Sequence, residues 1–422
     1  MDVYNRTAPD GEVSWSAPGP GPGARGPLTG IRIIELGSLI AGPFATRLLA
    51  DLGADVVKVE APAKPDPLRR WGAHGDDRSL WWAVQSRGKR CITLDLRVPK
   101  GQALLRRLAA QADVLVENFR PGTLERWDLG PERLREDNPG LIVARVSGYG
   151  QTGPYRERAG FASVAEAMGG LRHINGYPDA PPPRTGISLG DSLASLFAVQ
   201  GILAALYWRD TARDGTGQDV DVSLVESCFS MLESAVPDYD RLGIVRQASG
   251  TGLAGIVPSN IFRARDGRWI VIAANADNVF RRLAAAMGMP ELADDPRFHS
   301  HDARAEHQEA LERLIADWTS RHDAAAAAEL LNEHGVPCSP IYTIADIFAD
   351  PYFTEREMLI TMEDPELGSL TAPGVVPKLS ATPGAAGWPG RAEPGADNAV
   401  VYGDLLGMSP DQMTALAEEG IV

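Results

Sequence analysis

The chain has 422 residues, of which 44% are hydrophobic and 23% charged, with 41 basic against 56 acidic side chains. These proportions are typical of a folded enzyme of more than one domain, and they exclude a collagen, a coiled coil and a wholly disordered chain. The net charge of −15 argues against nucleic acid or an anionic membrane surface as a partner. We find no apolar run near the roughly 18 residues that a membrane-spanning helix needs, and we predict no membrane contact.

The cysteines and histidines indicate neither disulfides nor a metal site. The three cysteines, at 91, 228 and 338, are odd in number and far apart, which fits a reducing, cytoplasmic location. The only close histidines, at 299, 301 and 307, lack the spacing of a zinc site, and we predict no metal.

The first 26 residues are rich in glycine and proline and are expected to form a disordered leader. Short apolar runs then alternate with amphipathic stretches. We expect strands at 31–34, 55–60, 91–96, 113–117, 141–146 and 218–224, and helices at 44–52, 99–111 and 191–208. Helices between short buried strands predict a doubly wound, Rossmann-like α/β domain.

The pattern changes beyond about residue 226, where a smaller α+β domain is expected. A strand is predicted at 269–273 and helices at 279–287, 306–318 and 323–331. Near the end of the chain, Ser409 to Gln412 form a capping box that opens a last helix, to about residue 419.

Two glycine motifs match known patterns in the wrong context. Residues 250–255 fit GxGxxG, but Pro258 stands where the helix of a dinucleotide site should be; a flexible loop that could close over a ligand is favoured. Residues 186–190 fit the GxSxG motif of hydrolases, but three prolines precede it where a strand is needed. A hydrolase that uses Ser188 is one alternative function.

Asp191 stands at the start of the long apolar helix. Aspartate is a preferred N-cap, and capping alone would explain it. The same position also keeps a carboxylate ionised and close to free backbone N–H groups, as a nucleophile with an oxyanion hole requires. From spacing alone, capping is the favoured interpretation of Asp191, and the nucleophile is the alternative.

Several motifs, in order and spacing, resemble the class III CoA-transferases (CaiB/BaiF-like), the family of formyl-CoA transferase and carnitine CoA-transferase. They lie at 27–36, 41–43, 52–60, 88–96, 116–122, 147–150, 185–191 and 405–409. The resemblance implies a large CoA-binding α/β domain built from residues 27–225 plus 376–422, a small α+β domain at 226–375, and an interlocked homodimer.

The resemblance also implies the chemistry and the residues that perform it. Asp191 matches the catalytic aspartate, which forms a mixed anhydride with the donor acyl group and then an aspartyl-CoA thioester. The reaction needs no permanent cofactor, because the CoA thioester and a small carboxylic acid are the substrates. The positions that match CoA contacts are Ala41, Leu94, Asp95, Leu96, Arg97, Asn118, Phe119, Arg120 and Arg126. Lys89 and Arg90 are further candidates for the phosphates.

Departures from the formyl-CoA transferase pattern bear on which carboxylic acid the enzyme would use as a substrate. Ala61 replaces an arginine, Ile40 a glutamine, and Ser38 a histidine-type position, while residues 395–398 lack the histidine of the family pattern. A small doubly charged acid such as oxalate would lose partners here. We therefore expect a larger acid, with succinyl-CoA as donor and a medium dicarboxylate or branched acid as acceptor.

Two alternatives remain within the same fold. An α-methylacyl-CoA racemase exchanges a proton between a histidine and an aspartate, but Phe161 follows Ala159 and Gly160 where that histidine would stand. A non-catalytic CoA-binding protein is the other alternative, and it would be favoured if Asp191 proved inactive.

Overall fold

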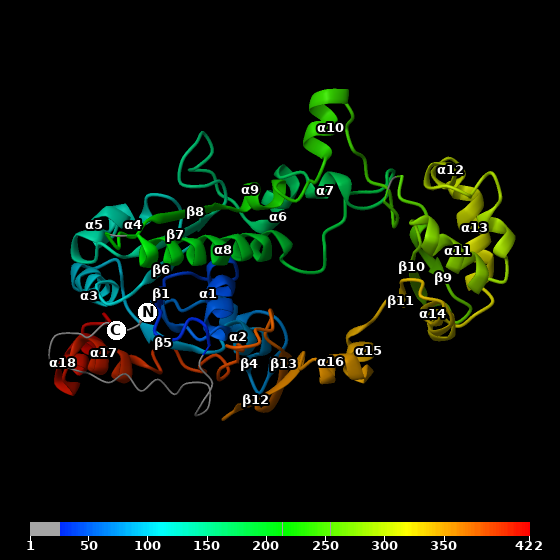
Figure 1. The fold of residues 1–422 in the computed structure, drawn as a ribbon. Helices are drawn as coiled ribbons and strands as arrows, with labels where there is room; N and C mark the ends of the chain where they lie inside the picture. Colours follow the sequence, from blue (N-terminus) through cyan, green and yellow to red (C-terminus); the bar gives the residue numbers. More distant parts are fainter. Residues whose placement is uncertain (1–25, 213, 254) are drawn as a thin grey trace. The chain divides into compact units, whose positions relative to one another are not determined.

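The computed structural model describes residues 26–212, 214–253 and 255–422. These residues form two compact units, which are described separately (Figure 1). The large unit comprises residues 26–169, 185–232 and 352–422, and the small unit comprises 170–184 and 233–351. The predicted leader lies outside the described residues except for Gly26, which is buried.

A six-stranded parallel sheet forms the centre of the large unit, in the order β5-β2-β1-β6-β7-β8. Its strands are β1 (Arg32–Glu35), β2 (Asp55–Glu60), β5 (Lys89–Thr93), β6 (Val114–Glu117), β7 (Ile142–Ser147) and β8 (Asp219–Ser223). The chain builds β2 and β5 on one side of β1 and then returns to place β6, β7 and β8 on the other. This is the predicted doubly wound sheet, and its strand order reverses between β1 and β6.

Neighbouring strand residues face opposite sides of the sheet, so each strand contributes to two cores. Ile33 and Val56 pack with α1 (Ala41–Asp51) and α8 (Leu189–Thr211) on one face. Ile34 and Val57 pack with α3 (Pro99–Ala109) and α17 (Asn398–Leu406) on the other. The helices of this unit are α1 (Ala41–Asp51), α2 (Leu80–Gln85), α3 (Pro99–Ala109), α4 (Thr123–Arg126), α5 (Pro131–Asp137), α6 (Ala162–Met168), α8 (Leu189–Thr211), α9 (Leu224–Phe229), α17 (Asn398–Leu406), α18 (Pro410–Glu418) and the 3₁₀ turn η1 (Pro67–Arg70).

Helix α8 corrects one expectation from the sequence. With a window of mean hydropathy 1.6, it is long and apolar enough to cross a membrane, by length and composition alone. The core helix of a folded domain passes the same test, and α8 packs Ile202, Ala205 and Leu206 into one core of the sheet. About 39% of the apolar window is buried, which leaves a large part of the helix surface uncovered by the described residues.

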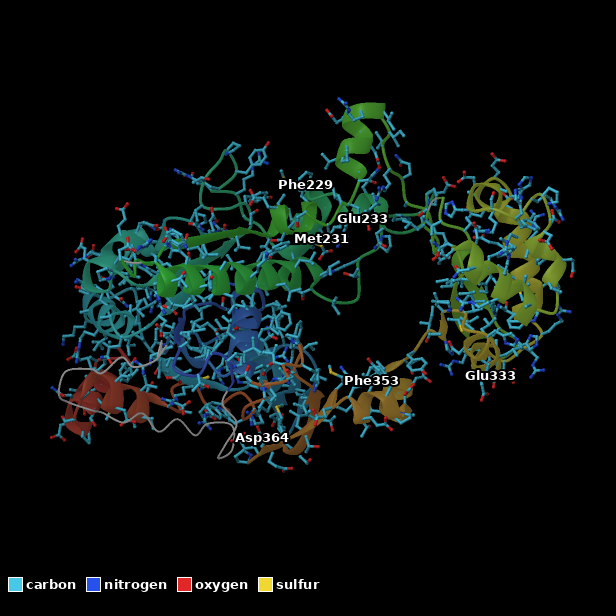
Figure 2. All side chains as sticks on the ribbon, in the orientation of Figure 1. Phe229, Met231, Glu233, Glu333, Phe353 and Asp364 are labelled. Atoms are coloured by element: carbon cyan, nitrogen blue, oxygen red, sulfur yellow. The ribbon has the colours of Figure 1, made fainter. Side chains whose placement is uncertain are left out.

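The C-terminal part of the chain covers the edge strand β5. Gly88 N–H donates to Trp388 O, the Trp388 indole donates to Lys89 O, and Cys91 N–H donates to Asp397. Before it, a hairpin of β12 (Leu359–Asp364) and β13 (Gly368–Pro373) joins the same unit. There, Asp364, labelled in Figure 2, pairs with Arg78 of the short β3 (His74–Gly75) and β4 (Arg78–Ser79) ribbon.

The small unit is α+β, with an antiparallel sheet in the order β11-β10-β9. Its elements are α7 (Leu171–Ile174), α10 (Ala235–Leu242), β9 (Ser259–Arg263), β10 (Trp269–Ala273), α11 (Asp277–Ala286), η2 (Pro290–Ala293), α12 (His301–Glu306), α13 (Gln308–Thr319), α14 (Ala324–Glu333), β11 (Cys338–Pro340) and α15 (Ile344–Ala349), with α16 (Pro351–Glu355) at the boundary. Arg304 is fully buried and donates to three backbone carbonyls, those of Val257, Asn275 and Phe298.

The two units divide the chain differently from the predicted boundaries. Residues 226–232 belong to the large unit because α9 packs on α6 and α8, and residues 352–375 belong to it through the β12–β13 hairpin. Residues 170–184 belong to the small unit, where Gly176 O accepts from Gly250 N–H. The glycine loop at 250–255 thus lies in the small unit, with residue 254 outside the described residues.

Candidate active site

A cavity of about 320 Å³ opens where the carboxyl ends of β1, β2, β5 and β6 meet. In doubly wound sheets, ligands bind at this edge, next to the point where the strand order reverses. We refer to it as the apolar cavity. It is lined by Leu36, Gly37, Ser38, Val59, Glu60, Ala61, Lys64, Pro65, Asp66, Pro67, Leu94, Asp95, Leu96, Arg97, Phe119 and Trp127.

Five of the residues predicted to contact CoA therefore meet in one cavity, although they come from two distant segments: Leu94, Asp95, Leu96, Arg97 and Phe119. The Phe119 and Trp127 rings pack edge to face, with centroids 5.4 Å apart. Arg97 is already engaged, because its guanidinium donates to both carboxylate oxygens of Asp95, at 2.9 and 2.7 Å.

A tight turn after β1 forms one wall of the apolar cavity. Asn118, directly after β6, holds it: its Oδ1 accepts from Ser38 N–H and its Nδ2 donates to Ser38 O, both at 2.9 Å. Leu39, with a φ of 64°, donates its N–H to the Asp66 carboxylate. Asn118, predicted to contact CoA, thus has a backbone partner on each amide atom. Its observed role is to hold the turn, which leads to Ala41 at the start of α1.

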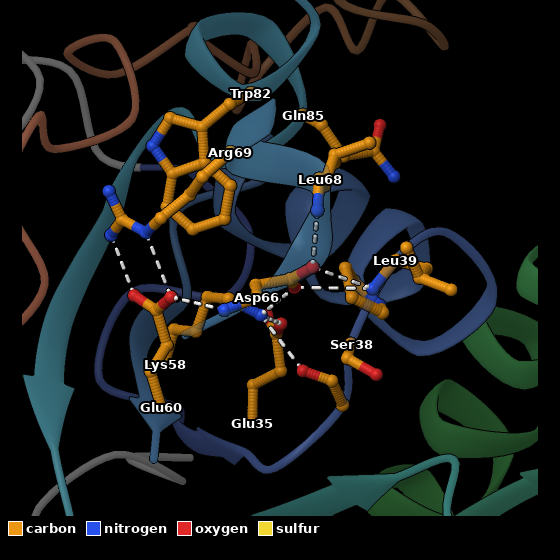
Figure 3. A network of polar contacts seen from close by, with 12 residues as sticks. Glu35, Ser38, Leu39, Lys58, Glu60, Asp66, Leu68, Arg69, Trp82 and Gln85 are labelled. Carbon is orange, nitrogen blue, oxygen red and sulfur yellow. Dashed lines mark hydrogen bonds and ion pairs between the residues drawn. The ribbon is translucent and has the colours of Figure 1, made fainter. Parts of the chain in front are cut away.

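A network of buried charges supports this turn (Figure 3). Glu35 accepts from Lys58 and Lys89, each at 2.7 Å, and all three side chains are fully buried. Burial alone would raise the pKa of Glu35, but the charges and hydrogen bonds of the two lysines outweigh it and lower the pKa to about 2. Lys58 also pairs with Asp66 at 2.8 Å, which links the network to Leu39.

Lys89 and Arg90 do not fit the role of binding phosphates. Lys89 is fully buried, with its Nζ 2.7 Å from both Glu35 and Pro43 O. Arg90 is 2% exposed and lies 3.5 Å from Asp55. The prediction was wrong because both residues lie in β5, whose edge the distant C-terminal segment covers.

A second cavity, of about 650 Å³, is lined by four arginines, and we call it the arginine cavity. It is formed by Arg120, Pro121, Gly122, Glu125, Arg126, Arg145, Gln151, Arg156 and Glu157. Among the described residues, Arg120 and Arg126 form no ion pair with a carboxylate, whereas Arg145 pairs with Glu125 at 2.7 Å. The sequence predicted Arg120 and Arg126 but not Arg145, Gln151 or Arg156, which come from β7 and the loop after it.

Glu117, at the end of β6, connects the two cavities. Its Oε2 accepts from Phe119 N–H at 2.6 Å and its Oε1 from Arg145 Nε at 2.9 Å. Burial raises the pKa of Glu117 to about 7, with the opposing effect of Arg145 smaller. Its carboxyl group thus orients one residue of each cavity.

Asp191 is the third residue of α8, so it is not the N-cap that its sequence position suggested. The helix begins two residues earlier, with Ser188 as the cap residue. The Ser195 hydroxyl lies 2.6 Å from Ala41 O and 2.7 Å from Asp191 O. It thereby ties the first turn of α8 to the start of α1, which follows the turn that lines the apolar cavity.

The residues around Ser188 also lack the local structure that a serine hydrolase of this type needs. Ser188 has a φ of −80° and precedes the helix, and residues 177–187 contain no strand. A nucleophile elbow needs a strand directly before the serine. Phe161, at the racemase histidine position, is an exposed residue before α6.

Comparisons with known proteins identify the family to which the chain belongs. The sequence model of CoA-transferase family III matches residues 28–398. This chain belongs to CoA-transferase family III. Succinyl-CoA–D-citramalate CoA-transferase of Chloroflexus aurantiacus is 51% identical to this enzyme, over 94% of this chain and 98% of that protein. The alpha subunit of succinyl-CoA–L-malate CoA-transferase from Chloroflexus aurantiacus is 39% identical, over 99% and 98% of the two chains.

The fold of this family III CoA-transferase also has an experimental counterpart. The crystal structure of a CaiB/BaiF family protein from Brucella suis matches it with a TM-score of 0.79 at 33% identity, over 90% of this chain and 100% of that chain. The resemblance seen in the sequence motifs is therefore confirmed at the level of family and fold.

Proposed function

We propose that this enzyme transfers CoA from succinyl-CoA to a dicarboxylic acid, with Asp191 as the nucleophile. The observation that carries the proposal is the apolar cavity. Residues from distant segments that match the family's CoA contacts meet there, at the carboxyl edge of the sheet. The Ser195 hydroxyl ties Asp191 O to Ala41 O, at the start of the helix that follows the turn in the cavity wall. The names of the relatives support the donor.

The proposed reaction has four balanced steps. The Asp191 carboxylate attacks the donor thioester carbonyl and expels CoA thiolate, which leaves a mixed anhydride. The thiolate then attacks the aspartyl carbonyl, releases the donor acid and forms an aspartyl-CoA thioester. The acceptor carboxylate attacks that thioester, expels CoA thiolate and forms a second mixed anhydride with Asp191. The thiolate then attacks the acceptor acyl carbon, which releases the Asp191 carboxylate and gives the acceptor acyl-CoA. One thioester replaces another, so no other energy source is needed.

The two cavities suggest how CoA is held. The leucine and aromatic side chains of the apolar cavity suit the pantetheine arm. Arg120 and Arg126 in the neighbouring arginine cavity have charges that no described carboxylate pairs with, and they suit the phosphates. Phe119 and Arg120, adjacent in the chain, line one cavity each.

The acceptor acid is proposed to be a hydroxy-dicarboxylate of the size of malate or citramalate. Ala61 in the cavity wall leaves space where formyl-CoA transferase has an arginine. Lys64 lines the same cavity and forms no ion pair within the described residues. It supplies a positive charge that suits the second carboxylate of a diacid.

A matrix of acyl-CoA donors against free acids, read by mass spectrometry for new thioesters, tests the proposal. We expect succinyl-CoA with citramalate or malate to give the fastest exchange, and Asp191→Ala to give none. Efficient, selective transfer to oxalate would refute the proposed acid. Epimerisation at the α-carbon without transfer would refute the reaction and favour a racemase.

We also propose a homodimer. Tyr207 and Trp208 on α8 are more than half exposed in the large unit, and Phe229 and Met231 at the end of α9 are exposed as well (Figure 2). Exposed large apolar side chains on these two helices are typical of an interaction surface. A second copy of the chain would cover it.

A further inference from the structure

The first turn of α8, which carries Asp191, has no capping side chain of its own. The first four N–H groups of any helix lack partners within the helix, and the Ser188 side chain makes no capping bond here. Instead, Gly190 N–H donates to Oε1 of Glu166 at 3.3 Å. Glu166 belongs to α6 and is 2% exposed. A carboxylate from another helix thus takes the place of the local cap.

Glycines bring the helices around Glu166 into close backbone contact. A Cβ on Gly190 would lie 3.1 Å from Ala162 O in α6, and one on Gly169, just after α6, would lie 2.6 Å from Cβ of Cys228 in α9. Such contacts leave little freedom for α6 to move relative to α8. The position of the Glu166 carboxylate is therefore set by packing.

The Cys228 thiol is affected by the charges of both Glu166 and Asp191. Burial first, and then the charges of Glu166 and Asp191, raise the pKa of the buried Cys228 thiol to about 11. Both carboxylates therefore lie within electrostatic range of one side chain. Glu166 thus acts on the same thiol as the proposed nucleophile, and it is the hydrogen-bond partner of the residue before that nucleophile.

We propose that Glu166 is a positioning residue for Asp191: by holding Gly190 N–H, it fixes the first turn of α8. This rests on the proposed nucleophilic role of Asp191. All four steps of the exchange form or break a bond at the Asp191 carboxyl group, so its position enters each barrier. A displacement of about 1 Å at a reacting group can cost on the order of 100-fold in rate.

The test compares substitutions that keep or remove the hydrogen-bond acceptor. Glu166→Gln retains an oxygen for Gly190 N–H, and we expect its kcat to stay within about threefold of the native value. Glu166→Ala removes the acceptor, and we expect kcat to fall at least about tenfold while KM for acyl-CoA changes less than twofold. Ala165→Gly is the control, because it weakens the same helix without touching the carboxylate.

Three outcomes would overturn the proposal. The first is an unchanged kcat in Glu166→Ala. The second is an equal loss of kcat in Ala165→Gly and Glu166→Ala when both variants are equally destabilised against heat. The third is a kcat in Glu166→Gln as low as that in Glu166→Ala. If Glu166→Ala fails to fold, Glu166→Asp replaces it. Its shorter side chain withdraws the acceptor but keeps the charge, so its kcat should fall below that of Glu166→Gln; equal or higher activity would contradict the proposal.

The same assays separate this inference from the proposed function. If Asp191→Ala is inactive while the Glu166 variants keep their kcat, only the positioning role fails. If Asp191→Ala still transfers CoA, the proposed mechanism itself fails.

Discussion

Arg126 and Arg97 differ in what their guanidinium groups already bind. Arg126 lines the arginine cavity, and within the described part of the chain its Nη2 donates only to the Thr123 hydroxyl. Arg97 forms a two-point pair with Asp95 and has a side chain that is 67% exposed. The same residue type, predicted for the same role, is therefore available to a phosphate to different degrees.

We predict that Arg126→Gln raises KM for acyl-CoA about tenfold, since a hydrogen bond to a charged group contributes about 1.5–3 kcal/mol. Arg97→Gln should raise it less, because Asp95 competes for the same guanidinium. The salt dependence of KM should also be shallower in Arg126→Gln. Initial rates at two salt concentrations measure both effects.

Arg133→Gln is the control for this pair. Arg133 lies outside both cavities and pairs with Glu136 and Asp128. An equal KM in all three variants and the native enzyme would show that the phosphates bind elsewhere.

Lys89 and Arg90 show where prediction from residue type stops. A basic pair that follows a glycine, as Lys89 and Arg90 do, is typical of an exposed turn. The structure buries it, because residues 388–397, about 300 positions later, cover the edge of β5. One signal was available: lysines and glutamates alternate with valines inside strands that a doubly wound sheet must bury, as in β2. Buried charges need partners, so Glu35, Lys58 and Lys89 could have been expected to meet.

At the scale of elements, the six strands of the parallel sheet were predictable, as were α1, α3, α8 and α18, because short apolar runs alternate with amphipathic stretches. The short helices α2, α4, α5, α6, α9 and α17 were not predicted. The start of α8 was not predicted either. Asp191 looks like an N-cap, yet the helix begins earlier, where Gly190 packs against Ala162 and donates its N–H to Glu166. Helix capping by a residue of another helix leaves no local pattern, so the sequence could not show it.

The Glu35 network is predicted to stabilise β1, β2 and β5 together. Glu35→Gln removes the negative charge that pairs with the buried ammonium groups of Lys58 and Lys89. We expect it to lower the free energy of unfolding by roughly 3–5 kcal/mol at pH 7. Chemical denaturation measures this loss. Glu136→Gln, which breaks a surface pair, should change the stability by less than about 1 kcal/mol.

The stabilisation by Glu35 should also depend on pH in a defined direction. The pKa of Glu35 is lowered from 4.5 to about 2 in the folded state. The carboxylate therefore contributes its full stabilisation above about pH 4.5 and loses it as the pH falls through about 2. The stability difference between the native chain and Glu35→Gln should narrow over that range. A difference that stays constant down to pH 2 would contradict the charge network.

At the scale of the whole molecule, the sequence indicated two domains but misplaced their boundaries. A change in composition along the sequence shows where the pattern of helices and strands changes. A compact unit, however, is defined by packing between residues that are far apart in the sequence. The β12–β13 hairpin looks like part of the small domain, yet it joins the large unit through Asp364 and the Pro373 carbonyl, which accept from Arg78 and Arg87. Such pairings link residues almost 290 positions apart.

From the exposed apolar side chains of α8 we predict that the protein forms a homodimer. We expect sedimentation at micromolar concentration to show a dimer, and Trp208→Glu to shift it toward the monomer, because a charge would have to be buried. Val400→Glu on α17, the helix on the opposite face of the sheet, is the control and should remain dimeric. A native chain that sediments as a stable monomer would contradict the proposed homodimer.

The nucleophilic role of Asp191 is the central claim, and one labelling experiment tests it most directly. Hydroxylamine added to the enzyme with succinyl-CoA should convert the activated Asp191 carboxyl group into a hydroxamate, detected by mass in the peptide that contains it. Asp210, at the far end of the same helix, should stay unlabelled, and no label should appear without the acyl-CoA. Transfer of CoA with Asp191 unlabelled, or with Asp191→Ala fully active, would contradict the mechanism.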